Sequence, residues 1–257
     1  MNKKEFGLKD IRRIAEFAVD FGADVIRCGG EVSRAEDSIM RICSALGAER
    51  TNVFAINSYI SVCVEDPFEE SEMVSRRIKG RETDLGRLEY LNQLSRWICD
   101  GKMKISDAEQ ALDVECGEAS VLFTYIASML VCSVFTLFFG GGIREAIVAG
   151  IAAIVTVMLK RKLKKRFGNA VAFTFVSSFL CGSLGAFLVV LGVAIDYSMI
   201  AKGDIMLLVP GVSIVCAGRD LICGELLTGL LGFVETVLIA IALAAGFALP
   251  EILINIF

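Results

Sequence analysis

The feature that most constrains this chain is the uneven distribution of its charged residues. Residues 1–115 contain 17 of the 26 basic and 22 of the 30 acidic residues, whereas residues 116–257 contain only 9 and 8. Because 55% of all residues are hydrophobic, the second part is too apolar for an ordinary soluble domain and has the composition of membrane-spanning helices. The sequence therefore predicts a soluble domain at 1–115 and a transmembrane domain at 116–257.

The first 115 residues are predicted to form a small α/β domain. Apolar residues recur at helical spacing over 10–28 and again over 31–47, and glycines follow each run. The other expected elements are strands at 51–56, 59–65 and 73–78 and helices at 84–99 and 106–114. Ser106 and Glu109 have the spacing of a capping box at the start of the last helix. The basic start of the chain is not followed by an apolar core, so we expect no cleavable signal peptide.

Apolar segments in the second part predict an α-helical polytopic membrane protein. Ala119 to Phe139 is a run of 21 residues without a charge, which is long enough to cross the hydrocarbon layer as a helix. The five expected transmembrane helices are 119–139, 143–159, 170–191, 199–218 and 226–249.

The segment KRKLKKR, Lys160 to Arg166, predicts the orientation of the chain. It holds six of the nine basic residues of the apolar part, and short loops rich in Lys and Arg stay in the cytoplasm. If the cluster is instead a solvated helix end that binds anionic membrane lipids, it is also expected on the cytoplasmic side. The α/β domain and the loop after Arg219 are therefore expected in the cytoplasm, with the chain in the plasma (inner) membrane. Because the number of spans is odd, a second half attached to this one would insert in the inverted orientation, an arrangement found in many transporters.

The composition also excludes several kinds of site. The chain has no histidine, which excludes a histidine-based catalytic triad and a zinc site that needs imidazole. Its early cysteines show no C-x-x-C spacing, so they are interpreted as reduced packing residues in a cytoplasmic setting. We expect no metal and no cofactor, and no basic surface interleaved with aromatics suggests nucleic acid.

Pro210-Gly211 interrupts the fourth predicted span. Proline removes a backbone hydrogen bond, and glycine loosens the next turn, so the helix is expected to break there. Broken helices inside membranes commonly surround a transport site, although a packing kink is the alternative.

Glu235 lies near the middle of the fifth predicted span. On a helix it shares a side with Thr228, Gly232 and Ala242, which predicts that it points into the bundle. A carboxyl group at that depth is costly and is usually kept for a function such as proton binding, although a structural acid is the alternative.

Arg219, Asp220 and Glu225 fall where the fourth predicted span ends and the fifth begins. They are either a solvated loop with a local ion pair or a substrate-binding group at the inner mouth, where Arg219 attracts a carboxylate. Position alone does not separate these two interpretations.

Three stretches carry a resemblance to a known family: CGGEVSRAEDSIMRICSALG, YISVCVED and LVPGVSIVCAGRDLICGELLTG. The chain resembles the threonine/serine exporter family, in particular the separate N-terminal subunit of its two-component form. It departs from the family pattern at Cys216, Glu225 and Thr228. The resemblance implies proton-driven export of threonine, serine or a dicarboxylate such as succinate. It also implies that a second, small multi-span membrane subunit is the partner.

The favoured hypothesis is a non-enzymatic exporter subunit whose substrate- and ion-binding residues are Pro210, Gly211, Arg219, Asp220, Glu225 and Glu235. One alternative is a membrane-tethered enzyme that uses acids of the soluble domain, namely Glu31, Asp37, Glu65 or Asp66. No phosphate-binding loop, metal-ligand cluster or activated nucleophile supports that alternative. The other alternative is a regulatory or scaffold membrane protein.

Overall fold

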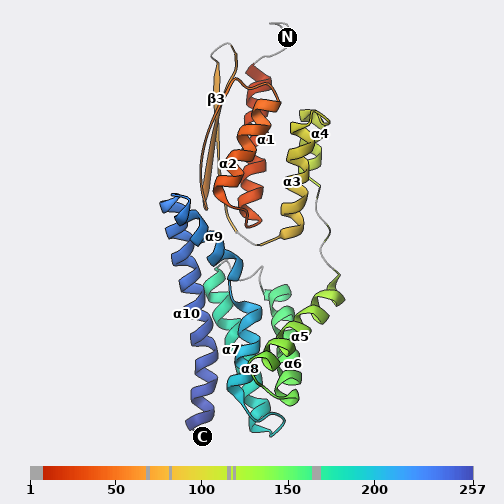
Figure 1. Ribbon diagram of the computed structural model, residues 1–257, viewed down its shortest axis with the longest axis vertical. Helices are drawn as coiled ribbons and strands as arrows, with labels where there is room; N and C mark the ends of the chain where they lie inside the picture. Colours follow the sequence, from red (N-terminus) through yellow and green to blue (C-terminus); the bar gives the residue numbers. More distant parts are fainter. Residues whose placement is uncertain are drawn as a thin grey trace. The chain divides into compact units, whose positions relative to one another are not determined.

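The computed structural model describes residues 8–67, 70–80, 83–114, 117, 120–163 and 169–256 (Figure 1). The chain packs as two compact units. One unit consists of Met1–Gly117 with Val212–Phe233, and the other of Glu118–Gly211 with Val234–Phe257. The domain boundary predicted after residue 115 stays a prediction, and the two units are described separately below.

The first unit contains a three-stranded antiparallel sheet in the order β1-β2-β3. Its strands are β1 (Arg50–Ile56), β2 (Tyr59–Glu65) and β3 (Ser71–Arg77). The register places Val62 between Val53 on β1 and Val74 on β3. All three predicted strands are present, and β3 begins two residues earlier than expected. Short connections between successive strands produce hairpins, so the domain is of the α+β type rather than an alternating α/β unit.

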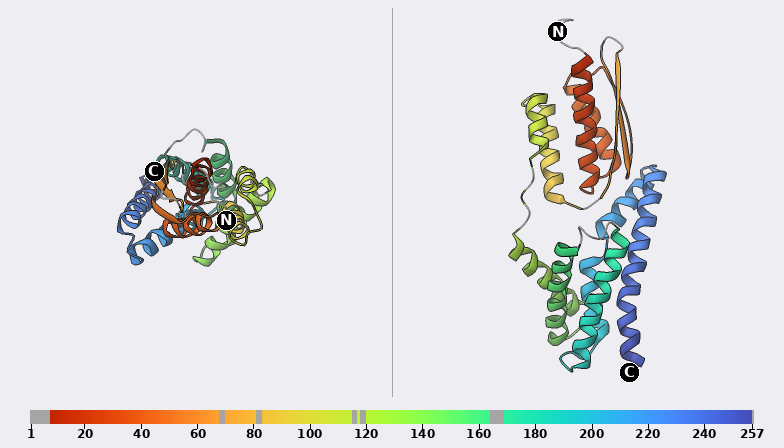
Figure 2. Two further views of the ribbon diagram at one scale, coloured as in Figure 1. Left: turned by 90° about the horizontal axis from the view of Figure 1, so that it is seen from above. Right: turned by 180° about the vertical axis from the view of Figure 1, so that it is seen from behind.

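Four helices of this unit form two further layers on one side of the sheet. They are α1 (Leu8–Arg27), α2 (Val32–Ala45), α3 (Leu85–Cys99) and α4 (Ile105–Leu112). In both side views α1 and α2 lie against the sheet, and α3 and α4 lie beyond them (Figures 1 and 2). The apolar core runs between the layers and includes the fully buried Phe21, Ile39, Ile60 and Leu91.

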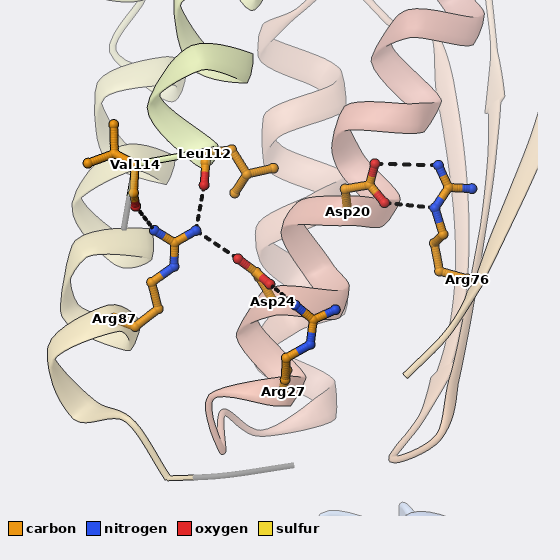
Figure 3. Close-up of polar contacts among 7 residues, drawn as sticks. All are labelled: Asp20, Asp24, Arg27, Arg76, Arg87, Leu112 and Val114. Atoms are coloured by element: carbon orange, nitrogen blue, oxygen red, sulfur yellow. Dashed lines mark hydrogen bonds and ion pairs between the residues drawn. The ribbon is translucent and has the colours of Figure 1, made fainter. Parts of the chain in front are cut away.

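Two arginines connect the layers of the soluble domain (Figure 3). Arg76 on β3 pairs with Asp20 on α1, with 2.8 Å between Nε and Oδ1. Arg87 on α3 pairs with Asp24 on α1 at 2.7 Å and also donates to the backbone carbonyls of Leu112 and Val114. The Arg87 side chain is only 12% exposed, so this contact fixes the C-terminal end of α4 from inside the domain.

The capping box predicted at Ser106 is wrong. Helix α4 begins at Ile105 and follows Lys104, which provides no side-chain cap. Ser106 already belongs to the first turn, where its hydroxyl hydrogen-bonds to Asp107. By contrast, Asp84 caps α3 by accepting a hydrogen bond from the Arg87 amide at 2.9 Å.

The apolar part of the chain contains six helices among the described residues. They are α5 (Val121–Phe138), α6 (Ile143–Leu163), α7 (Ala170–Val190), α8 (Tyr197–Leu208), α9 (Gly211–Ile222) and α10 (Leu226–Ile256). In the described residues, α5, α7 and α10 are each long and apolar enough to cross a membrane, and the bent pair α8 and α9 gives a fourth span if counted as one. Helix α6 carries charged residues at both ends, and the predicted total of five spans stays a prediction.

Small residues bring the helices of the second unit into backbone contact. A Cβ atom added at Gly203 of α8 would collide with Thr136 and come within 2.8 Å of the Cys132 carbonyl on α5. One added at Gly246 of α10 would collide with Ser178 and come within 2.9 Å of the Phe175 carbonyl on α7. Ser178, Gly182 and Ala186 lie at four-residue intervals on α7 and are buried, as small residues at a helix–helix contact commonly are.

Candidate functional site

The predicted helix break at Pro210-Gly211 is present. Helix α8 ends at Leu208, and Val209 adopts an extended conformation with φ −59° and ψ 127°. Proline cannot donate a backbone hydrogen bond, and the Gly211 amide donates to the Val209 carbonyl at 2.8 Å before α9 begins. Helix α8 is therefore not continued by another helical turn.

Arg219 and Asp220 lie in the last turn of α9 and point in different directions. Arg219 is exposed, and its Nη1 lies 2.7 Å from Oε1 of Glu31, which precedes α2 in the same unit. Asp220 is buried, with only 4% of its surface exposed. Arg219 therefore has a partner 188 positions away in the sequence.

Glu225 ends the turn after α9 and is half-buried. Its amide donates to the Asp220 carbonyl at 2.9 Å, and the preceding Gly224 has a φ of 93° that favours glycine. The charge of Glu225 also acts on Glu36 of α2. Burial raises the pKa of Glu36, the hydrogen bond from the Ala55 amide opposes that rise, and Glu225 adds to it.

Glu235 is exposed on α10, and the prediction that it points into the bundle is wrong. Its predicted neighbours Thr228, Gly232 and Ala242 are buried. At about 100° per residue, Glu235 is turned about 60° from Gly232, so its side chain leaves the helix beside the buried side rather than within it. Its role as a site residue stays a prediction.

The structure identifies a buried acid that was not among the predicted site residues, Asp204 of α8. Asp204 lies within the fourth predicted span, 199–218, and α8 begins at Tyr197. Asp204 is 2% exposed. The helical spacing of Tyr197, Ala201 and Asp204, all buried, is the signal that could have found it.

Thiols and hydroxyls surround Asp204 in the second unit. Its carboxyl interacts electrostatically with Cys132 of α5, Cys181 of α7 and Tyr197 of α8. Cys181 lies 2.7 Å from the Thr156 hydroxyl of α6. The Tyr197 hydroxyl donates to the Phe247 carbonyl of α10 at 2.8 Å. Every helix of this unit therefore contributes to the surroundings of Asp204, directly or through one neighbour.

Outside the apolar helices, a surface depression of about 290 Å³ lies between α2 and α3. Its polar lining is formed by Arg34, Glu89, Asn92, Gln93 and Arg96, and contains no serine, cysteine, threonine or lysine that could act as a nucleophile. Over the described residues there is no group of three or more acids or cysteines that could hold a metal.

The four acids considered for an enzyme each have a partner in the same unit. Glu31 contacts Arg219, Asp37 pairs with Arg41 at 2.8 Å, and Glu65 lies 3.9 Å from Arg50. Asp66 accepts a hydrogen bond from the Glu70 amide at 2.9 Å. These contacts account for the acids as structural and surface residues.

Comparison with known proteins decides the family. The ThrE family model, which describes threonine/serine exporters, matches residues 16–251. The chain belongs to the threonine/serine exporter family. No curated protein and no solved structure matches it. Family membership and the apolar helices make the protein a membrane protein of the exporter class, which agrees with the resemblance carried by its sequence motifs.

Proposed function

We propose that this exporter moves threonine and serine out of the cytoplasm across the plasma (inner) membrane, with the proton gradient as the driving force. The observation that carries the proposal is the helix break between α8 and α9 in a chain whose family match covers residues 16–251. Free carbonyl and amide groups at a break suit a zwitterionic amino acid, whose ammonium group donates and whose carboxylate accepts hydrogen bonds.

Space at the break supports the same proposal. A Cβ atom added at Gly211 would meet no atom within 4 Å, so α9 begins without a side chain packed over its first residue. The N-terminal end of a helix favours negative charge, and the end of α9 is therefore suited to a substrate carboxylate. We infer that the substrate passes close to Pro210 and Gly211.

The surface of α10 supports a second membrane subunit as the partner. Glu235 is exposed, and the apolar Leu231, Leu238 and Ile241 near it are 49%, 49% and 60% exposed. Ionisable residues at membrane depth rarely face lipid and usually face protein or a water-filled cavity. A partner helix packed on this side of α10 would bury Glu235 and complete the transporter.

The orientation proposed for the exporter rests on the basic end of α6. Lys160, Arg161 and Lys162 lie in its last turn, and the rest of the predicted cluster, 164–166, lies outside the described residues. Basic residues at this position attract anionic lipids and favour the cytoplasmic side. We infer that the soluble domain is cytoplasmic and that it regulates access to the transport path.

The test is uptake of labelled threonine, serine and succinate into everted membrane vesicles that contain the chain and its companion subunit. An imposed pH gradient is expected to drive accumulation of threonine and serine, and succinate serves as the dicarboxylate alternative. Vesicles that accumulate none of the three, with both chains inserted, would contradict the proposal. Activity of the soluble domain on a metabolite would instead favour a membrane-tethered enzyme.

The Pro210→Ala variant tests the helix break in the same vesicles. Alanine restores an amide donor and allows α8 and α9 to join, so we expect transport to fall about tenfold or more, the effect of about 1.4 kcal/mol on the barrier. Gly218→Ala is the matched control, because Gly218 lies within α9 and an added Cβ would meet no atom within 4 Å. Equal transport by Pro210→Ala and wild type would remove the break from the mechanism.

A further inference from the structure

Burying the carboxyl group of Asp204 costs free energy. Neither carboxylate oxygen of Asp204 has a hydrogen-bond partner of ordinary geometry among the described residues. An ionised carboxylate without partners in an apolar environment costs several kcal/mol even after relaxation, whereas the neutral acid loses only about 1–3 kcal/mol for unmade hydrogen bonds. In this conformation the side chain is therefore expected to carry a proton.

Among the described residues, the charge of Asp204 interacts with thiols and a phenol, and no ion pair with a cation is formed. These groups are the Cys132 thiol of α5, the Cys181 thiol of α7 and the Tyr197 hydroxyl of α8. Thiols and phenols are ordinarily neutral near pH 7. The Cys132 thiol interacts with the carboxyl group, and a thiol is only a weak hydrogen-bond donor. The surroundings thus select the neutral acid rather than an ion pair.

The position of Asp204 connects it to the helix break. It lies in the last turn of α8, which ends at Leu208, before Pro210. Its neighbour Gly203 touches the α5 backbone, where an added Cβ would lie 2.8 Å from the Cys132 carbonyl. A small movement of α8 against α5 would therefore change the surroundings of Asp204, and a hinge for that movement is present at Pro210.

We propose that Asp204 is the residue that binds and releases the coupling proton of this exporter. In the described conformation the proton is bound to a carboxylate oxygen and shielded from water. Movement of α8 admits water, the O–H bond breaks, and the proton passes to water while the carboxylate becomes hydrated. This inference rests on the proposed function, because it assigns a residue to the proton coupling proposed above.

Glu235 is a less suitable residue for this role in the chain by itself. It is exposed on α10, so none of the described residues separates it from its surroundings in one state and exposes it in another. Asp204 is buried within its own unit, where α5, α6 and α7 pack against α8.

The first experiment measures the proton directly. Infrared spectra of the full chain in lipid bilayers at neutral pH are expected to contain the carbonyl band of a protonated carboxyl group, and Asp204→Asn should abolish that band. Asp196→Asn is the matched control, because Asp196 is exposed at the start of the same helix and asparagine caps a helix equally well. A spectrum of Asp204→Asn that keeps the whole band would overturn the proposal.

The second experiment separates proton coupling from substrate binding in everted vesicles. Because asparagine imitates the protonated acid, Asp204→Asn is expected to keep exchange of labelled for unlabelled threonine and to lose accumulation driven by a pH gradient. Asp196→Asn should keep both activities. Accumulation retained by Asp204→Asn overturns the proposal, and so does loss of exchange in a correctly inserted variant, which would assign Asp204 to the substrate.

The two experiments distinguish failure of the proposed function from failure of the assignment of Asp204. If wild-type vesicles move none of the tested solutes, the proposed function fails, and the infrared band still decides whether Asp204 holds a proton. If transport is present and the Asp204→Asn spectrum is unchanged, only the assignment of Asp204 fails. Asp204→Glu provides a further check, since it keeps an ionisable group and is expected to recover part of the proton-driven accumulation.

Discussion

At the scale of single residues, the environment of each acid differs from what its place in the sequence suggests. Asp204 and Glu235 both lie in apolar helices, yet Asp204 is buried and Glu235 is exposed. Asp220 is buried beside the exposed Arg219. Neighbours along the chain therefore predict the cost of an acid in a helix but not the side on which the carboxyl lies, because that depends on helices distant in sequence.

Glu36 gives a pH-dependent prediction at this scale. Burial raises its pKa, so the folded chain holds the Glu36 proton more tightly than the unfolded chain. Stability is then lost as pH rises from the unfolded towards the folded pKa and stays lower above it. Glu36→Gln removes the charge and keeps an oxygen for the Ala55 amide. We expect it to increase the free energy of unfolding at pH 7 and to have no such effect at pH values below the ordinary pKa of a glutamate.

Fluorescence of Trp97, the single tryptophan, measures this effect in the detergent-solubilised chain during unfolding by urea. Trp97 packs against the core of the soluble domain and therefore reports on that domain. Asp37→Asn is the control, because Asp37 forms an exposed pair with Arg41, and its effect on stability should be small at both pH values. A loss of stability in Glu36→Gln at pH 7 would contradict the prediction.

At the scale of helices and strands, a few polar contacts fix elements whose apolar packing is not specific. Helix α4 has eight residues, too few to be stable alone. Its C-terminal carbonyls are held by Arg87 of α3, which also pairs with Asp24 of α1 (Figure 3). One guanidinium group therefore joins three helices, and its planar set of donors is well suited to this role.

The Arg87→Ala variant tests this arrangement. It removes the donor to the Leu112 and Val114 carbonyls and leaves Asp24 with Arg27, which lies 2.7 Å away, as its remaining partner. We expect the soluble domain to lose about 2–4 kcal/mol of stability, as measured by Trp97 fluorescence in urea. Arg41→Ala is the control; both side chains of its pair are more than half exposed, so its cost should stay below about 1 kcal/mol. If the two variants lose the same amount of stability, the contacts of Arg87 contribute no more than an exposed surface pair does.

At the scale of the whole molecule, two of the motifs that identify the family meet in one ion pair. Glu31 belongs to the glycine-led segment before α2, and Arg219 belongs to the segment that follows Pro210. Their 2.7 Å contact places α9 in the same compact unit as the soluble domain. The Arg219 side chain is 64% exposed, so the pair contributes little to stability, and its value lies in linking the domain to the segment after the break.

Charge exchange tests this link. Arg219→Glu places two carboxylates together, so we expect threonine export to fall, and the double variant Glu31→Arg with Arg219→Glu is expected to restore part of it. Uptake into everted vesicles measures all three forms, with protein amount as the control for insertion. Arg41→Glu should leave export unchanged, because Arg41 pairs only locally with Asp37 on α2. A double variant no better than Arg219→Glu would exclude a role for the pair.

Properties that arise from local chemistry could be predicted from the sequence. The separation of charged and apolar parts, the strand at Tyr59–Glu65 and the break after Val209 all follow from residue composition, period and the missing proline amide. The tertiary structure alone decided that Glu235 is exposed and that Arg219 contacts Glu31. Each of these depends on which distant helix covers a side chain, and the chain next to the residue does not contain that information.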